Sequence, residues 1–318
     1  MPWQTLSAYA LGMVLFASPL AWAEEPLVDL ASEFEQLKKQ EEPTPQGRPA
    51  PNHSGPTVDK AGEPIAQAAA AHAHGHNKAH WGYTGMEAPQ YWHQLSEEFA
   101  LCGSGKNQSP IDLRDASAIG TQGLPDLDIR YRDVPLKVIN NGHTVQVNYP
   151  LGSYIKIGGK RYELLQYHFH TPSEHQKEGF NYPMEVHLVH SDGNGNLAVI
   201  GVLFQEGQHN RYLDILLKRL PKEVGKQEID TKYGLNPVHF IPNNTDFYKY
   251  SGSLTTPPCS EGVYWMVFKE PIEASVLQIQ KMNEMMGENA RPVNPLHSRA
   301  LLKSWSESIQ EPLPYEFQ

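Results

Sequence analysis

Hydrophobic and polar residues alternate along several short segments in the middle of the chain. This alternation predicts strands over residues 145–149, 154–157, 162–170, 185–190, 197–204 and 263–268. Pairs such as Asn141-Gly142 and Gly158-Gly159 separate some of these segments and are typical of hairpin turns. Helical spacing is sparse, and the best candidates for helices are residues 212–220 and 274–286. We therefore expect residues 80–318 to form one β-rich (α+β) domain with few helices.

The N-terminus has the features of a signal peptide. Residues 1–23 carry no charged side chain, contain an apolar stretch from Ala8 to Leu20, and end in Ala21-Trp22-Ala23, which fits a cleavage site. We predict cleavage after Ala23 and an exported protein, periplasmic or secreted, with no membrane association afterwards. An uncleaved anchor is the alternative, because a charge-free stretch of this length can just span a bilayer.

Residues 24–79 are predicted to be an acidic segment followed by a disordered linker. Residues 24–42 hold seven Asp or Glu against two Lys, and their large apolar residues have helical spacing. Residues 43–79 contain six prolines and nine alanines. They offer little that a core could bury, so burial cannot offset the entropy lost on ordering.

The chain has fifteen histidines; His72, His74 and His76 lie close together near the end of the linker, and His80 follows just beyond it. A histidine-rich tract of this kind can bind divalent metal ions. It is equally well described as a solvated, Ala-rich tether that carries histidines. The sequence leaves both interpretations open.

Charge and hydropathy exclude two classes of protein. The 318 residues include 26 Lys and Arg against 36 Asp and Glu, and the net charge of −10 argues against a nucleic-acid-binding protein. After residue 23 no apolar run approaches the ~20 residues that a membrane-spanning helix requires, so a polytopic membrane protein is excluded. Hydrophobic residues make up 39% of the chain, which is enough for one large core.

Cys102 and Cys259 are the two cysteines of the chain. Export would place them in an oxidising compartment, where a single pair of cysteines favours a disulfide. Two buried free thiols are the alternative.

Two segments place histidines where they could share one metal ion. Alternation along the strand predicted over 162–170 puts His168 and His170 on one face, with Tyr167 and Phe169 on the other. If the strand predicted over 185–190 pairs with it, His187 supplies a third ring nitrogen. Glu185 lies on the same face as His187 and can accept the second ring N–H of a ligand histidine.

Three histidines without a cysteine ligand leave a fourth coordination position open, which is typical of catalytic rather than structural zinc sites. The alternative is a group of hydrogen-bonded core histidines. His175 and His190 are expected to be of that structural kind, and the odd spacing between His187 and His190 turns His190 to the opposite face.

Further motifs extend this pattern along nearly all of the chain after the linker. They are His80-Trp-Gly-Tyr83, Asn107-Gln-Ser-Pro-Ile-Asp112, Asn140-Asn-Gly-His143, Ser173-Glu-His175, Glu185-Val-His-Leu-Val-His190, Gly252-Ser-Leu-Thr-Thr-Pro-Pro258 and Asn289-Ala-Arg-Pro292. Together with the His168 and His170 strand, they resemble the α-class carbonic anhydrases, in the exported form found in bacteria. The resemblance covers residues from about 81 to 316.

The resemblance implies a large, twisted, mostly antiparallel sheet with short peripheral helices, and one Zn²⁺ ion in the catalytic domain. It implies that His168, His170 and His187 are the zinc ligands, and that the groups around these ligands are Gln166, Glu185 and Asn289. It also implies the disulfide between Cys102 and Cys259.

The implied activity is the zinc-dependent, reversible hydration of CO₂ to bicarbonate and a proton. In the family, a threonine matching Thr255 accepts a hydrogen bond from zinc-bound hydroxide, and a glutamate matching Glu174 receives the threonine proton. His143 matches the proton shuttle. Tyr83, Asn141 and Gln146 match the lining of the water path, and the apolar wall that holds CO₂ matches Val189, Val199, Leu254, Val263 and Trp265.

Two alternatives remain beside the enzyme. One is a catalytically silent zinc-binding protein on the same fold. The other is a metal-handling protein in which the tract from His72 to His80 acquires zinc for the site. The expected partner is the small-molecule substrate, and the sequence leaves open whether the chain forms a homodimer.

Overall fold

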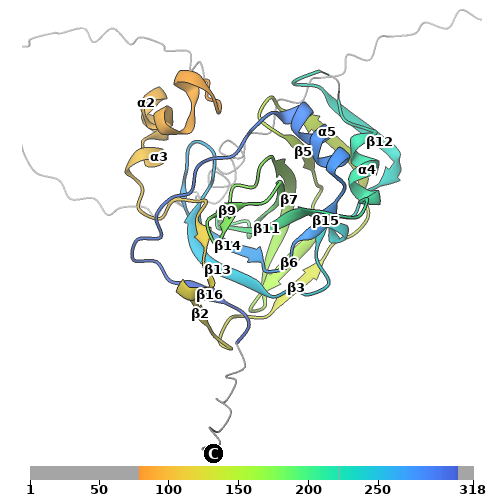
Figure 1. Ribbon diagram of the computed structural model, residues 1–318. Coiled ribbons are helices and arrows are strands. Elements are labelled where there is room, and N and C mark those ends of the chain that lie inside the picture. The colour runs from red at the N-terminus through yellow and green to blue at the C-terminus, as the bar shows by residue number, and fades with distance from the viewer. Residues whose placement is uncertain (1–78, 222, 307–318) are drawn as a thin grey trace, which may run out of the picture.

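The computed structural model describes residues 79–221 and 223–306 (Figure 1). The signal peptide predicted for residues 1–23, the acidic segment 24–42 and nearly all of the linker, including His72, His74 and His76, lie outside these residues. Those interpretations stay predictions. Within the described residues, no helix is long and apolar enough to cross a membrane.

The described part of the chain is built on one 13-stranded, strongly twisted sheet (Figure 1). Its main path runs in the order β12 (Gln227–Gly234), β4 (Pro135–Asn140), β5 (Val145–Asn148), β7 (Lys160–His170), β10 (Met184–Ser191), β11 (Leu197–Glu206), β14 (Glu261–Phe268), β13 (Phe247–Ser253), β16 (Leu301–Lys303) and β2 (Ala118–Gly120). Three strands lie off this path: β6 (Tyr154–Ile157), β3 (Leu127–Arg130) and β15 (Ile272–Ala274). A smaller sheet contains β1 (Asp112–Leu113), β8 (Gln176–Lys177) and β9 (Phe180–Asn181).

Most strand pairs are antiparallel, as predicted. The central strands β7, β10 and β11 are joined in this way, while β14 and β15 run parallel to β11, and β2 runs parallel to β16. The sheet is therefore mixed: every pair from β12 to β11 on the main path is antiparallel, and the parallel pair β11–β14 joins this part to the rest.

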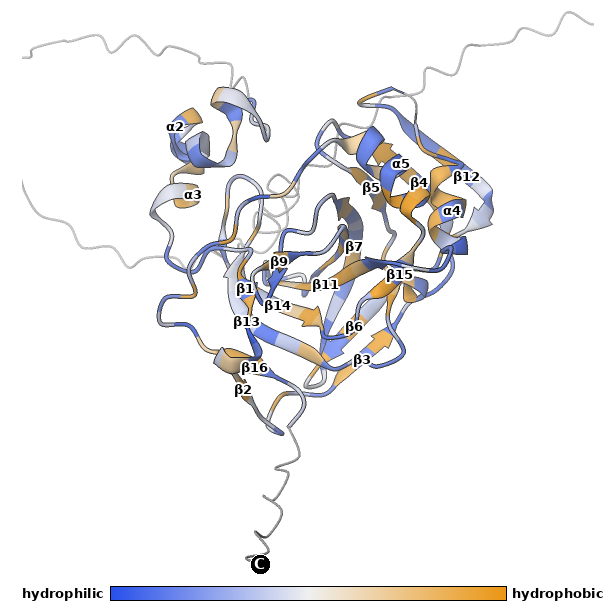
Figure 2. Ribbon diagram, viewed as in Figure 1, coloured by the Kyte–Doolittle hydropathy of each residue, from blue (hydrophilic) through white to orange (hydrophobic). Residues whose placement is uncertain are grey.

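The central strands are buried on both faces, so the sheet separates two apolar clusters. Tyr167 and Phe169 of β7 belong to the larger cluster, which the helices help to cover. Val189 of β10 and Trp265 of β14 belong to the smaller one. Figure 2 shows the resulting band of hydrophobic residues along the central strands. Because alternation sends His168 and His170 away from Tyr167 and Phe169, these histidines share a face with the smaller cluster.

Short helices lie around the sheet. They are α2 (Trp92–Leu95), α3 (Leu101–Ser104), α4 (Arg211–Leu217) and α5 (Val276–Met286), with 3₁₀ turns at Gly85–Glu87, Pro89–Tyr91, Glu97–Phe99, Asp115–Ser117 and Pro237–Phe240. Asn210 caps α4 and Ser275 forms a capping box with Gln278 on α5. The Gln278 amide also exchanges two hydrogen bonds with the Asn210 backbone, at 2.9 and 2.7 Å, which ties the two helix starts together.

All six predicted strands are confirmed, with ends that differ by no more than two residues. The helix predicted over 212–220 ends earlier, at Leu217, because the next two residues form a turn. The helix predicted over 274–286 begins two residues later, because Ala274 belongs to β15 and Ser275 is the N-cap.

Gly252 marks a place where two strands and the N-terminal segment approach closely. A Cβ atom at this position would lie 2.2 Å from Ser109 Oγ and 2.8 Å from Trp265 Cδ1. We expect Gly252→Ala to lower the free energy of unfolding by about 1–3 kcal/mol, because overpacking forces buried neighbours to shift. Urea denaturation measures this, with Gly123→Ala as the matched control, since its Cβ would meet Thr121 Oγ1 at an ordinary 3.4 Å. Equal stability of the two variants would contradict the prediction.

Candidate active site

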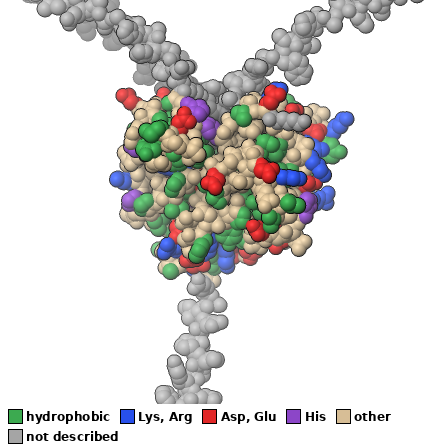
Figure 3. Space-filling model, turned by 45° about the horizontal axis from the view of Figure 1, so that its top comes forward, with side chains coloured by type: hydrophobic (Ala, Val, Ile, Leu, Met, Phe, Trp, Pro, Cys, Tyr) green, Lys and Arg blue, Asp and Glu red, His purple; other side chains and the backbone are tan. Residues whose placement is uncertain are grey.

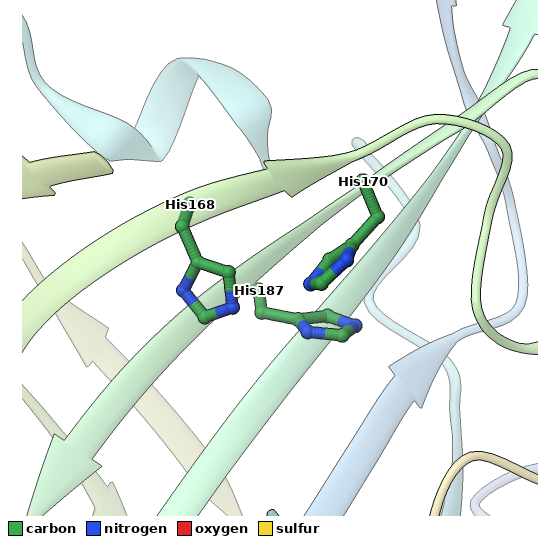
Figure 4. A group of neighbouring side chains, drawn as sticks. All are labelled: His168, His170 and His187. Atoms are coloured by element: carbon green, nitrogen blue, oxygen red, sulfur yellow. The ribbon is translucent and has the colours of Figure 1, made fainter. Parts of the chain in front are cut away.

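Three histidines converge from two neighbouring strands. His187 of β10 lies directly opposite His168 of β7 in the antiparallel register, and His170 lies two residues further along β7. The ring centroids are 5.1 Å apart for His168 and His170, 5.3 Å for His168 and His187, and 4.6 Å for His170 and His187. Figure 4 shows the three rings pointing toward one another. One ring nitrogen of each lies within 4.8 Å of the others, so the three could hold a single metal ion.

In each of the three histidines, one ring nitrogen, called the outer one here, lies within hydrogen-bonding distance of an oxygen atom of a neighbouring residue. His168 Nδ1 lies 2.8 Å from Gln166 Oε1, and His170 Nδ1 lies 2.8 Å from the Asn289 carbonyl oxygen. His187 Nε2 lies 2.9 Å from Glu185 Oε1.

A carbonyl or carboxylate oxygen only accepts, so each outer nitrogen carries the proton and each inner nitrogen carries a lone pair. The three inner atoms, Nε2 of His168 and His170 and Nδ1 of His187, are then neutral ligands that face one point. Within the described residues, His170 Nε2 is buried without a hydrogen-bond partner. A buried polar atom without a partner is costly, and a bound metal ion would satisfy it.

Burial keeps the three rings neutral. It lowers the pKa of His168 well below its usual range, and the charges of His170 and His187 lower it further. Burial likewise lowers the pKa of His170 to about 4 and lowers that of His187. Neutral imidazole is the form that binds metal.

Two buried carboxylates beside the histidines have opposite pKa shifts. Burial would raise the pKa of Glu185, but the charges and hydrogen bonds of His175 and His187 outweigh it and hold that pKa well below its usual range. Burial raises the pKa of Glu174 to about 7, against the opposing effects of His187, of the Thr255 hydroxyl and of the Arg291 backbone N–H. Glu185 is therefore a fixed anion behind His187.

Glu174 occupies a position between the histidines and Thr255. Its Oε1 atom accepts the Arg291 backbone N–H at 2.9 Å. Its Oε2 atom lies 3.5 Å from His170 Nε2 and 3.8 Å from His187 Nδ1, the two inner nitrogens on that side. Thr255 is buried and interacts with the same carboxylate. The structure thus brings together the residues that the sequence singled out.

The expected apolar wall is a single cluster on the same side of the sheet. The cluster contains Val189, Val199, Leu254, Val263 and Trp265. The Trp265 ring lies 4.9 Å from the His187 ring, so this wall borders the group of three histidines directly.

The residues that are expected to form the proton path also lie close together in the structure. Asn141 Oδ1 accepts the backbone N–H groups of His143 and Thr144 at 2.9 Å, which fixes the turn that presents His143. Asn141 Nδ2 lies 3.4 Å from Gln146 Oε1, and Gln146 lies opposite His168 in the register of β5 and β7. Burial, and then the charge of Glu174, raises the pKa of Tyr83 well above its usual value, which places the phenol near the carboxylate.

A sequence model of the eukaryotic-type carbonic anhydrase family matches residues 87–305. The chain belongs to this family. A carbonic anhydrase of Nostoc sp. is 45% identical over 226 residues, which cover 70% of this chain and 86% of that protein. A carbonic anhydrase of Neisseria gonorrhoeae is 41% identical over 235 residues, covering 73% and 91%. The α-carbonic anhydrase of Thermovibrio ammonificans, solved with the inhibitor sulfanilamide, is 46% identical with a TM-score of 0.68, covering 71% of this chain and 99% of that one.

The two histidines expected to be structural in this carbonic anhydrase are confirmed in that role. His175 is buried between Glu185 Oε1 and the Tyr250 hydroxyl, both at 2.7 Å. His190 faces the other side of β10, where its ring lies 2.8 Å from the Tyr131 hydroxyl and 3.1 Å from the Ala198 carbonyl.

The predicted disulfide is confirmed. Cys102 and Cys259 are bonded, with their Cα atoms 5.1 Å apart, and they join α3 to the loop that carries Thr255. A disulfide is the form expected of an exported protein.

Sequence reasoning gave no role to several residues that shape this site. Arg291 is one, because its backbone N–H, which no sequence pattern reveals, holds Glu174. Gly201 is another: it lies opposite His187, and a Cβ there would come 2.8 Å from Glu185 Oε1. Trp81 and Glu87 are two more. The Trp81 ring stacks on His143, and Glu87 contacts His80. The aromatic run that begins at Trp81 could have pointed to Trp81, whereas no sequence pattern marked Glu87.

Proposed function

We propose that this protein is an exported, periplasmic or secreted, carbonic anhydrase that binds one zinc ion through His168, His170 and His187. The reaction is the reversible hydration of CO₂ to bicarbonate and a proton. The observation that carries the proposal is the set of three inward lone pairs, each fixed by a hydrogen bond at the opposite ring nitrogen. Three neutral nitrogen ligands suit zinc and leave one position for water or substrate.

Zinc, when bound, supplies the Lewis acid that lets water ionise near neutral pH, a behaviour for which carbonic anhydrase is itself the standard example. The protein's own residues then orient the attacking oxygen atom. Glu174 accepts a hydrogen bond from the Thr255 hydroxyl, so the Thr255 oxygen would offer a lone pair to the attacking water or hydroxide. That hydrogen bond aims the nucleophile at the apolar wall, where Val189, Val199 and Leu254 hold CO₂ free of water.

The proton released by the reaction leaves through His143. An imidazole titrates near neutrality, so it can accept a proton from the water path and release it to buffer. Tyr83, Asn141 and Gln146 line that path. Fixed, neutral hydrogen-bonding groups there order the water without trapping the proton.

Stopped-flow CO₂ hydration by the purified protein, with zinc content measured on the same sample, tests the proposal. We expect one zinc per chain and rapid hydration that is abolished by sulfanilamide, the inhibitor bound by the relative from Thermovibrio ammonificans. One zinc per chain with hydration no faster than buffer would support the catalytically silent alternative instead.

We expect Thr255→Val to lower kcat/KM about 100-fold, because removal of one precisely aimed hydrogen-bonding group at a reaction centre has an effect of this size. Zinc content should be unchanged, since Thr255 holds no ligand histidine. Thr231→Val, at an exposed position on the edge strand β12, is the matched control. Loss of zinc from Thr255→Val, or unaltered kcat/KM, would contradict the assigned role.

We expect His143→Ala to lower kcat at least about ten-fold in dilute buffer, because proton transfer then lacks its positioned carrier. kcat/KM should stay unchanged, since that ratio reports the attack on CO₂ before the proton leaves. Concentrated imidazole buffer should restore kcat. A variant that is slow at every buffer concentration would instead indicate a structural role for His143.

A further inference from the structure

Asn289, in the segment after α5, is fully buried and forms hydrogen bonds through both its backbone and its side chain. Its backbone N–H donates to the Thr171 carbonyl at 3.1 Å, and its own carbonyl accepts the His170 ring N–H at 2.8 Å. Its side-chain oxygen accepts the Thr171 backbone N–H at 2.8 Å. Its side-chain Nδ2 atom donates to the carbonyl oxygens of His143, at 2.9 Å, and Phe169, at 3.0 Å. One residue therefore contacts both the proposed zinc ligand His170 and the proposed proton shuttle His143.

Two kinds of hydrogen bond hold the turn that carries His143. Within the turn, Asn141 Oδ1 accepts the backbone N–H groups of His143 and Thr144. From the turn to other segments, Thr144 Oγ1 bonds to both backbone polar groups of Phe169 at the end of β7, and the His143 carbonyl accepts from Asn289. Because the Asn289 bond is made to the His143 backbone itself, it acts directly on the position of this residue.

The position of the His143 ring follows from that of its backbone. The ring stacks on Trp81, with centroids 3.9 Å apart and planes within 7°. The His143 side chain is half-buried, and Figure 3 shows histidine side chains beside acidic ones at the top of the molecular surface. Proton transfer from the water path depends on this placement, because misplacement of a reacting group by about 1 Å can slow a reaction greatly.

We propose that Asn289 is a positioning residue for proton transfer, whose side-chain amide holds the His143 turn in a fixed place relative to the metal site. This inference rests on the proposed function. The backbone carbonyl of the same residue orients His170, so one buried group holds both the metal ligand and the shuttle. Substitution of the side chain leaves that carbonyl in place. The two roles of Asn289 can therefore be separated by experiment.

Asn289→Ala removes the amide and keeps the carbonyl that binds His170. In stopped-flow CO₂ hydration by the full-length protein, we expect kcat to fall several-fold in dilute buffer and to recover in concentrated imidazole. Zinc content and kcat/KM should stay at the parent values. A merely structural role of Asn289 would lower kcat and kcat/KM together, and imidazole would not reverse that loss.

Thr171→Val is the matched control. It removes a buried hydroxyl that contacts Asn283 Oδ1 at 3.2 Å and the Gly287 carbonyl at 3.0 Å. The Asn289 amide keeps its hydrogen bonds in this variant, so we expect the parent kcat in dilute buffer.

NMR spectroscopy tests the position of His143 independently of activity. Stacking on Trp81 gives the ring C–H signals of His143 a ring-current shift, and His143→Ala identifies these signals by their loss. We expect the shift to shrink in Asn289→Ala and to persist in Thr171→Val, with or without zinc. In the His143→Ala background, Asn289→Ala should lower kcat no further, because both substitutions impair the same step.

Three results would overturn the inference while leaving the proposed function intact. They are a parent-like kcat for Asn289→Ala in dilute buffer, unchanged His143 signals in that variant, and a further loss of kcat in the double variant. If Asn289→Ala does not fold, Asn289→Asp replaces it. Its carboxylate still accepts the Thr171 N–H but has no proton for the His143 carbonyl, so the same losses are expected at alkaline pH. A parent that does not hydrate CO₂ would contradict the proposed function instead, and the NMR comparison would still decide what holds His143.

Discussion

His187→Ala is expected to abolish CO₂ hydration and to yield protein without bound zinc. The substitution removes one of the three proposed nitrogen ligands, and the two that remain on β7 cannot define a tetrahedral site. Loss of a group that merely orients a ligand already lowers metal affinity about 10–100-fold, so loss of the ligand itself should exceed that. Metal analysis of the purified variant, beside stopped-flow hydration, measures both effects.

Misfolding would also give an inactive, zinc-free protein, so the prediction needs a second variant. Glu185→Gln keeps the size of the side chain and removes the charge that His187 Nε2 and His175 Nδ1 contact at 2.9 and 2.7 Å. We expect it to remain folded and to bind zinc about 10–100-fold more weakly, measured by competition with a chelator. Unchanged zinc affinity in Glu185→Gln, or full activity in His187→Ala, would refute the assigned ligand set.

Alternation along the sequence predicted the geometry of this site because the strands are regular. His168 and His170 share a face of β7 as the period of two requires, and β10 pairs so that His187 meets His168. The same rule placed His190 on the other face. The face on which each histidine lies depends only on the regular alternation of a strand. It can therefore be predicted from the sequence once the pairing of the two strands is assumed.

The rest of the site depends on contacts between segments far apart in the chain. Asn289 binds His170 through its carbonyl oxygen, and Arg291 holds Glu174 through its backbone N–H. Neither interaction uses the side chain that the sequence displays, so no residue pattern reports it. The family resemblance supplied Asn289, but it could not show which of its atoms acts.

The edge of the sheet was missed for a different reason. β12 exposes nearly all of its side chains, and its residues therefore have no alternation of buried and exposed positions. Ile229, Thr231 and Tyr233 alternate with charged residues along β12, but both sets are largely exposed, so the strand is held by its backbone pairing with β4 and not by a buried face. The six predicted segments were strands with at least one buried face, and two of them, β7 and β10, carry the three histidines. Two further strands with buried faces, β4 and β13, were missed.

Replacing both cysteines, Cys102→Ala with Cys259→Ala, is expected to lower the free energy of unfolding by about 3–5 kcal/mol. The bond joins residues separated by 157 positions, and a cross-link over so long a loop removes much conformational freedom from the unfolded chain. Urea denaturation of the double variant and the parent measures the difference. Parent protein unfolded in the presence of a reductant should fall to the stability of the variant, which controls for the substitutions themselves.

The double cysteine substitution should lower kcat/KM much less than it lowers the free energy of unfolding. Gln108 Nε2 donates to the Cys259 carbonyl at 3.0 Å, and the Arg291 guanidinium donates to the Cys102 carbonyl at 3.0 Å. These backbone contacts hold both ends of the bridge without the sulfur atoms, and Leu254 N–H binds the Ser260 carbonyl across the same loop at 3.0 Å. Thr255 therefore keeps its position while the protein remains folded. A double variant with parent-like stability but a much lower kcat/KM would show the reverse. The disulfide would then position the Thr255 loop, and would not stabilise the fold by restricting the unfolded chain.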